Sequence, residues 1–150
     1  MALKSKVTFF FERKTALLHR KKLKNFIEMM FNREGKELRS LNYVFCSDSK
    51  LFSINKQYLN HDYYTDIITF DLSKKKMPIE GEVYISVDRV KDNAVLYNET
   101  FQKELHRVIF HGVLHLCGFG DKNKRESIKM REMELKYLKM YFNFHGTLFH

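Results

Sequence analysis

The sequence predicts a single α+β domain over residues 1–150, in which a small mixed four-stranded sheet packs with about five helices. The 150 residues and the mass of 18.1 kDa suit one domain and leave no room for two sizeable cores. Hydrophobic residues make up 44% and aromatic residues 15%, which is enough apolar material for a buried core. Four short strand-like runs lie among about five segments of helical periodicity, and this mixture favours α+β, or α/β with a small mixed sheet.

The first half of the chain is expected to form two strands and two helices. Val7–Phe11 and Leu41–Cys46 are rich in β-branched and aromatic residues, as strands are. The helix between them is indicated by an apolar stripe with a spacing of i, i+3, i+4, i+7 and i+8, and Gly35 ends it. After the second strand, Ser47 or Asp48 caps a short helix. The apolar stripe of the first helix consists of Leu23, Phe26, Ile27, Met30 and Phe31, and the short helix carries Leu51, Ile54, Asn55 and Tyr58.

The second half of the chain is expected to form two strands, joined by a loop, and then three helices. Its elements are a strand at Asp66–Leu72, a loop at Ser73–Gly81, a strand at Glu82–Ser86, a helix from Asp88, a helix at Thr100–Cys117 and a helix at Asn123–Phe142. Three lysines and the lone proline indicate the loop, and Gly118 and Gly120 end the fourth helix. The apolar face of the last helix consists of Ile128, Leu135, Leu138 and Phe142. Residues 143–150 are expected to be a loose tail.

Charge and cysteine content narrow the classes of partner and site. There are 27 Lys and Arg residues against 18 Asp and Glu, a net charge of +9, which favours an anionic partner such as nucleic acid or an acidic membrane surface. Two cysteines exclude a disulfide scaffold and a four-cysteine zinc site. The apolar run at Val7–Phe11 is too short for a secretory signal, and no run approaches the ~20 apolar residues of a membrane span. We therefore expect a cytoplasmic protein with no membrane partner.

The segment RVIFHGVLHLCGFGDK, residues 107–122, carries the chemistry. His111 and His115 are four residues apart and lie ~40° apart on one helical face, so two neutral imidazoles can bind one divalent ion. After the glycine turn, Asp121 is the first residue able to offer an oxygen donor to the same point. Two histidines and one carboxylate leave a position for water, as catalytic zinc sites do. Two histidines at this spacing also occur by chance, and the spacing alone leaves that alternative open.

Zinc peptidases with the H-x-x-x-H spacing place a glutamate after the first histidine as general base. Here Gly112 occupies that position. The sequence therefore argues against a peptidase.

Three segments together resemble the YbeY endoribonucleases, also called rRNA maturation factors. The family signature H-G-x-L-H-L-x-G-[FY]-D-H matches HGVLHLCGFGD at every specified position from His111 to Phe119. The segment INKQYLNHDYYTDIITF, Ile54 to Phe70, is similar to a second family segment, and Gly81 to Ser86 is similar to a third. These segments lie in the expected order and cover most of the chain from Ile54 to Asp121.

The resemblance implies a metal-dependent single-strand endoribonuclease that acts in ribosomal RNA maturation and ribosome biogenesis, with rRNA or the ribosome as partner and no DNA. It implies one zinc per chain, held by His111 and His115, with Asp121 at the position of the third family histidine, so that another divalent metal also fits. No catalytic side chain is assigned, and a metal-bound water is the expected nucleophile. Leu59 stands where the family has an arginine suited to a phosphate, and Gly120 stands where it has an aspartate.

Several roles stay open at this stage. The residues expected to bind RNA are Arg107, Lys122, Lys124 and Arg125, with Lys74–Lys76, Arg89 and Lys91 as further basic residues that are equally consistent with a solvated surface. Glu104 is expected to be a surface residue rather than an acceptor for an imidazole, Cys117 a core residue, and Asn55, Thr65 and Asp66 structural residues. If Asp121 is not a ligand, the candidates are His61, His145, His150 and, last, His106.

Two alternative functions remain. One is a non-catalytic ribosome-assembly factor in which the metal stabilises the fold, and it is favoured by the missing arginine at Leu59. The other is a metal-dependent hydrolase of a small substrate.

Overall fold

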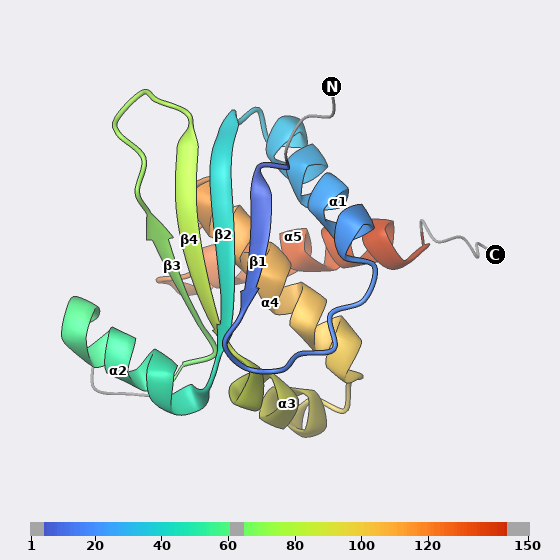
Figure 1. Cartoon of the computed structure of the whole chain (residues 1–150). Coiled ribbons are helices and arrows are strands. Elements are labelled where there is room, and N and C mark those ends of the chain that lie inside the picture. The colour runs from blue at the N-terminus through green and yellow to red at the C-terminus, as the bar shows by residue number, and fades with distance from the viewer. Residues whose placement is uncertain (1–4, 61–64, 144–150) are drawn as a thin grey trace.

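The described residues form one mixed sheet with the strand order β1-β2-β4-β3 (Figure 1). The structure is a computed structural model that describes residues 5–60 and 65–143. Strands β1 (Val7–Phe11), β2 (Leu38–Cys46) and β4 (Ile79–Ser86) are parallel, and β3 (Ile67–Asp71) is antiparallel to β4 at the edge. The prediction of a mixed four-stranded sheet is therefore confirmed.

Five helices among the described residues pack on the two faces of this sheet. They are α1 (Arg20–Arg33), α2 (Asp48–Leu59), α3 (Val87–Leu96), α4 (Phe101–Leu116) and α5 (Lys124–Asn143). The main core joins α1, α4 and α5 to the sheet face that carries Tyr43, Val83 and Ile85. Helix α2 covers part of the opposite face through a smaller cluster of Leu51, Ile54, Cys46 and Ile68. Helix α4 thus lies on the main-core side, with α5 packed against it.

Local chemistry explains where the helices begin and end. The side chains of Ser47, Ser86 and Thr100 accept hydrogen bonds from backbone amides in the first turns of α2, α3 and α4. Of the two caps that the sequence allowed for α2, the structure selects Ser47. After α4 the backbone at Gly118 has φ +103°, a conformation that L residues with a side chain rarely adopt. This glycine turns the chain back toward the helix it has just left.

Two further glycines let α4 approach the sheet closely. A Cβ atom at Gly112 would lie 3.3 Å from both γ-carbons of Val83. A Cβ atom at Gly81 would lie 2.6 Å from a δ-carbon of Leu116. Because neither position has a side chain, α4 packs tightly over β4, and the residues on its flank come to lie beside β3.

Three predicted boundaries or faces are wrong. Strand β2 begins at Leu38, and β4 begins at Ile79, inside the segment predicted as a loop, because the two strands pair over their full length. The predicted apolar face of α5 is also wrong, because Ile128 and Leu135 are about half exposed. The buried residues of α5 are Met130, Met133, Glu134, Tyr137, Leu138 and Tyr141. Within the predicted tail, Asn143 is the last residue of α5, and the rest lies outside the described residues.

No helix among residues 5–60 and 65–143 is long and apolar enough to cross a lipid bilayer.

Candidate metal centre

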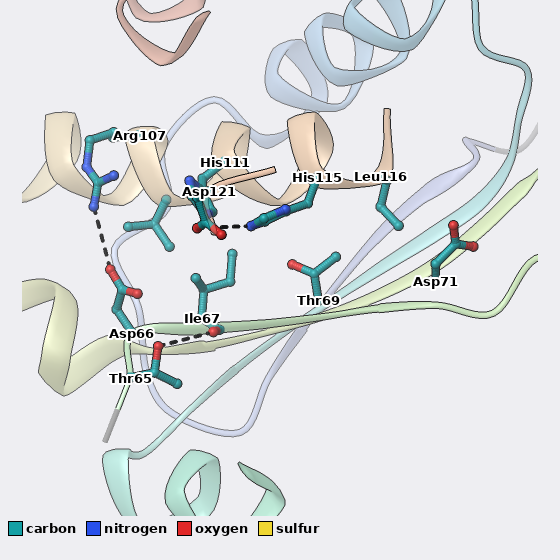
Figure 2. A pocket seen from close by; sticks show the side chains of 11 residues that line it. Thr65, Asp66, Ile67, Thr69, Asp71, Arg107, His111, His115, Leu116 and Asp121 are labelled. Carbon is teal, nitrogen blue, oxygen red and sulfur yellow. Dashed lines mark hydrogen bonds and ion pairs between the residues drawn. The ribbon is translucent and has the colours of Figure 1, made fainter. Parts of the chain in front are cut away.

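A cavity of about 490 Å³ lies between α4 and β3 (Figure 2). Helix α4 contributes side chains spaced about one turn apart, and β3 contributes alternate residues, since successive strand residues point to opposite faces. The lining residues are Thr65, Asp66, Ile67, Thr69, Asp71, Arg107, Val108, His111, His115, Leu116 and Asp121. All three residues predicted as metal ligands therefore line one cavity.

The donor atoms of these three residues converge. The Nε2 atoms of His111 and His115 each lie 3.3 Å from Oδ2 of Asp121. The two imidazole rings are nearly perpendicular, with centroids 4.5 Å apart. All three donor atoms lie within 4.8 Å of one another. Three groups from two turns of a helix and the following loop thus point at one place.

This geometry fits a divalent metal. Donors about 2.0–2.1 Å from a tetrahedral zinc are separated from one another by about 3.3–3.4 Å. The separations from Asp121 to the two histidine nitrogens match this value. Two imidazole nitrogens and one carboxylate oxygen are also a donor set that zinc accepts. The arrangement leaves one side facing the cavity, where a water or a substrate oxygen has room.

The loop that carries Asp121 is held by the start of α5. The amide of Lys122 donates to Oε1 of Glu126 at 3.0 Å, and Ser127 Oγ donates to the carbonyl of Asp121 at 3.3 Å. A Cβ atom at Gly120 would lie 2.5 Å from Oε1 of Glu126, so glycine leaves room for this contact. These contacts with the start of α5 hold the backbone of the turn that carries Asp121.

Glu134 of α5 orients the first histidine. Nδ1 of His111 lies 2.6 Å from Oε2 of Glu134, whose side chain is only 3% exposed. Burial raises the pKa of Glu134, but the hydrogen bond from His111 and the charge of Arg107 outweigh it, so this pKa lies below its usual value. An ionised carboxylate only accepts hydrogen bonds, so Nδ1 of His111 carries the proton. The lone pair of Nε2 then faces Asp121 and the candidate metal position.

The second histidine is kept neutral by its surroundings. Burial and the neighbouring His111 lower the pKa of His115, although Asp121 acts in the opposite direction. A neutral imidazole is the form that binds a metal.

Arg107 lies among carboxylates rather than on the solvent surface. Its Nε and Nη2 donate to the two oxygens of Glu104 at 3.0 and 2.8 Å, and its Nη1 donates to Glu134 at 3.1 Å. Nη2 also lies 3.5 Å from Oδ2 of Asp66 across the cavity. Burial lowers the pKa of Arg107, but its hydrogen bonds to Glu104 and Glu134 and the charges of these two carboxylates outweigh burial and raise it. The prediction that Glu104 is a surface residue is wrong, because its side chain is 3% exposed.

The structure also shows where the other predicted residues lie. Lys122, Lys124 and Arg125 are exposed at the beginning of α5, next to Asp121. Thr65 and Asp66 line the cavity as well as ordering the chain before β3, and Cys117 is buried in the main core as predicted. Asn55 is buried on α2, and Leu59 is exposed at the end of that helix.

Of the four histidines that were alternative candidates for the third ligand, one lies within the described residues and three lie outside them. His106 lies in an aromatic cluster, with its ring stacked on Tyr141 at a centroid distance of 5.1 Å. Its ring therefore points away from the candidate metal position, as the helical spacing predicts. His61, His145 and His150 lie outside the described residues.

Sequence reasoning missed Glu134. The available signal was a charged residue between Met133 and Tyr137 in the stripe that α5 buries, since a buried carboxylate needs a partner. That signal was lost because a different apolar face was assigned to the helix.

Comparisons with known proteins agree on one family. The sequence profile of the family described as Endoribonuclease YbeY matches residues 9–142. A protein named Endoribonuclease YbeY from Cytophaga hutchinsonii is 46% identical over 134 residues, which cover 88% of this chain and 94% of that protein. A protein of the same name from Christiangramia forsetii is 40% identical and covers 92% of this chain and 96% of its own length.

A solved structure has the same fold. The solution structure of a protein from Thermotoga maritima superposes with a TM-score of 0.63 and 31% sequence identity. The match covers 91% of this chain and 89% of that protein.

Proposed function

The chain belongs to the endoribonuclease YbeY family, and we propose that it is a metal-dependent endoribonuclease that cleaves single-stranded RNA during ribosomal RNA maturation. The observation that carries the proposal is the convergence of His111, His115 and Asp121 in the cavity between α4 and β3. The relatives that carry the endoribonuclease name cover nearly the whole chain, cavity included.

The metal we propose is zinc, one per chain, held by Nε2 of His111, Nε2 of His115 and a carboxylate oxygen of Asp121. A bound divalent metal supplies a Lewis acid for a phosphoryl oxygen and a water of lowered pKa. Since the third donor is an oxygen rather than an imidazole, the site also accepts other divalent metals.

The protein's own residues prepare this site before substrate arrives. Glu134 holds the His111 ring and its tautomer, and the start of α5 holds the loop of Asp121. Burial keeps His115 neutral. We infer that this preorganisation is the contribution of the fold, because a donor that is already oriented loses less freedom when the metal binds.

RNA and the ribosome are the proposed partners, and the cytoplasm is the proposed location. The exposed Lys122, Lys124 and Arg125 lie beside Asp121, where they would attract the RNA backbone largely independently of sequence. Arg107 drops out of this set, since three carboxylates surround its guanidinium group.

A second candidate function is a non-catalytic ribosome-assembly factor with a structural metal. It is favoured by Leu59, which occupies the position of the family arginine and leaves no guanidinium group there for a phosphate.

The test is to measure metal content and RNA degradation together in the wild type and in His115→Ala. Our proposal expects about one zinc per wild-type chain and degradation that is lost with the metal in the variant. His106→Phe is the matched control, since it changes a histidine of the same helix outside the cavity, and it is expected to keep both properties. RNA binding without degradation in the metal-loaded wild type would favour the assembly factor instead. Absence of metal after zinc reconstitution would contradict both.

A further inference from the structure

The cavity of the metal donors has two different ends. At one end Arg107 of α4 and Asp66, just before β3, form an ion pair of 3.5 Å that spans the gap between the two elements (Figure 2). At the other end lie Leu116 and Asp71. These two residues also line a second hollow of about 460 Å³, so the two spaces adjoin there. A chain-like ligand that enters the metal cavity can therefore continue past Leu116 into the second hollow.

The second hollow is lined by lysines from two segments that are distant in the sequence. Lys36 comes from the turn between α1 and β2, and Lys74–Lys76 come from the loop between β3 and β4, beside it at the same end of the sheet (Figure 1). All four are exposed. Glu37 and Asp71 are the acidic residues among its lining residues, so the lysines are in excess.

The two spaces therefore carry opposite charge. Among the described residues, the metal cavity is lined by Asp66, Asp71 and Asp121, and the guanidinium group of Arg107 is engaged by carboxylates. Without a metal this space repels a phosphate. The second hollow attracts one, because its ammonium groups exceed its carboxylates.

The loop that presents the lysines has a defined backbone. The amide of Ser73 donates to Oδ1 of Asp71 at 2.9 Å, and the amide of Glu80 donates to Oγ of Ser73 at 2.8 Å. Within the loop, the amide of Met77 donates to the carbonyl of Lys74 at 3.0 Å. These bonds tie both ends of the loop to the strands and place the lysines over the hollow.

We propose that the hollow lined by Lys36 and Lys74–Lys76, here named the lysine subsite, binds backbone phosphates of the RNA strand next to the position of cleavage. The proposal rests on the function proposed above, and it adds the direction in which the RNA strand leaves the metal donors. The strand lies along α4 and β3 at the metal donors, passes Leu116 and Asp71, and is anchored electrostatically on the lysine subsite. In the opposite direction the strand would meet the ion pair of Arg107 and Asp66, where carboxylates surround the guanidinium group.

The test compares two triple variants of equal charge change. One is Lys74→Gln, Lys75→Gln, Lys76→Gln in the subsite. The control is Lys50→Gln, Lys56→Gln, Lys91→Gln, which changes three exposed lysines on α2 and α3 at the opposite end of the sheet (Figure 1). Binding of a single-stranded oligouridylate is measured at several salt concentrations with EDTA present, so that no cleavage occurs and the salt dependence reports the number of phosphate contacts.

For the wild type we expect affinity to fall steeply with salt. Loss of three phosphate contacts lowers the slope of log K against log salt by about 2 and weakens binding at least about tenfold at 0.1 M salt in the subsite variant. The control variant is expected to stay within about threefold of the wild type. Lys36→Gln, in the other segment, should lower the slope by about 0.7.

The outcomes separate this inference from the function it rests on. If the wild type binds RNA and the subsite variant binds it equally well, or the control loses as much affinity, the lysine subsite is overturned while RNA binding stands. If the wild type shows no salt-dependent binding with EDTA, and none when zinc replaces EDTA and an uncleavable oligonucleotide is used, the RNA-cleaving function itself is contradicted. Zinc affinity, measured on all variants, is expected to be unchanged, which shows that they fold and keep the metal centre.

Discussion

The contact between helices α4 and α5 has an aromatic half and an ionic half, and each half contains a histidine of α4. In the aromatic half, His106 packs against Tyr141, Phe110 and Phe142 with ring centroids 5.1–6.1 Å apart. In the ionic half, seven residues earlier along α5, Glu134 accepts a hydrogen bond from His111. The difference teaches that the role of a histidine on one helix depends on the residue that the opposite helix places against it.

The two halves also contribute differently to the stability of the folded protein. Buried aromatic rings in contact stabilise the fold through the removal of apolar surface from water and through favourable ring geometry. The buried carboxylates of Glu104 and Glu134 cost desolvation, which Arg107 and His111 offset. We therefore expect changes in the aromatic half to act on folding, and changes in the ionic half to act on metal binding.

The largest effect is expected for Tyr141→Ala. Tyr141 is almost fully buried, and its ring contacts those of Phe26, Phe110 and Phe142 in addition to His106. Truncation to alanine leaves a large cavity and should lower the free energy of unfolding by about 3–5 kcal/mol. Urea denaturation of the metal-free protein measures this loss. Tyr141→Phe keeps the ring and is expected to lose less than about 1.5 kcal/mol.

The division between a folding half and a metal-binding half is contradicted if Tyr141→Ala lowers the free energy of zinc binding to the folded protein as much as it lowers the free energy of unfolding. We expect zinc binding at a stoichiometry of one in the folded fraction of both variants.

The next effect is expected at the third proposed ligand. Asp121→Ala leaves two protein donors, and loss of one donor should weaken zinc binding by about 3 kcal/mol, on the order of 100-fold. Asp121→His restores a donor atom at the same position, so its affinity should stay within about tenfold of the wild type. Chelator competition measures all three proteins. Wild-type affinity in Asp121→Ala would show that the third ligand lies elsewhere.

The elements that the sequence predicts correctly depend on residues that are close together in the chain, and the wrong predictions concern contacts between distant residues. Helix α4 and its caps depend on neighbouring residues, so periodicity, Thr100 and Gly118 predict them, and Asp121 follows from the turn. The start of β4 at Ile79 depends on pairing with β2, about forty residues away, and the lysines and proline before it indicated a loop.

The partners of the site were less predictable for the same reason. Glu134 reaches His111 only because α5 folds back along α4, and the sequence allowed a second apolar face for α5. The pairing of Arg107 with Asp66 depends on how α4 crosses β3. Local patterns therefore predict which groups have the right chemistry, and tertiary packing decides which partners they meet.

A smaller effect is expected for Glu134→Gln, which keeps the shape of the side chain and removes its charge. The tautomer of His111 is then less firmly fixed, and loss of such a carboxylate partner typically lowers metal affinity 10–100-fold. Arg131→Gln is the control, since Arg131 lies 3.5 Å from Glu134 but is largely exposed, and it should leave affinity unchanged within about twofold.

A positioning role also predicts a spectroscopic change. Cobalt substituted for zinc should show a shifted visible spectrum in Glu134→Gln and an unchanged one in Arg131→Gln. Equal zinc affinities and equal cobalt spectra in Glu134→Gln and the wild type would remove Glu134 from the metal centre.

The smallest effect is the pH dependence of stability in the metal-free protein, and it arises from the same half. Burial and His111 hold the pKa of His115 below 6.5 in the folded state. Between that lowered pKa and 6.5, the unfolded chain binds a proton that the folded chain does not, so stability falls as the pH decreases below about 6.5. Glu134 acts in a lower window, because its pKa lies below 4.5 in the folded state and its contribution is lost only as the pH falls through that value. Thermal unfolding between pH 7 and pH 5.5 should therefore show a decrease in Tm that is smaller in His115→Gln than in the wild type. An equal decrease in His115→Gln would mean that other groups, and not the histidine of the metal centre, make the fold sensitive to acid in this range.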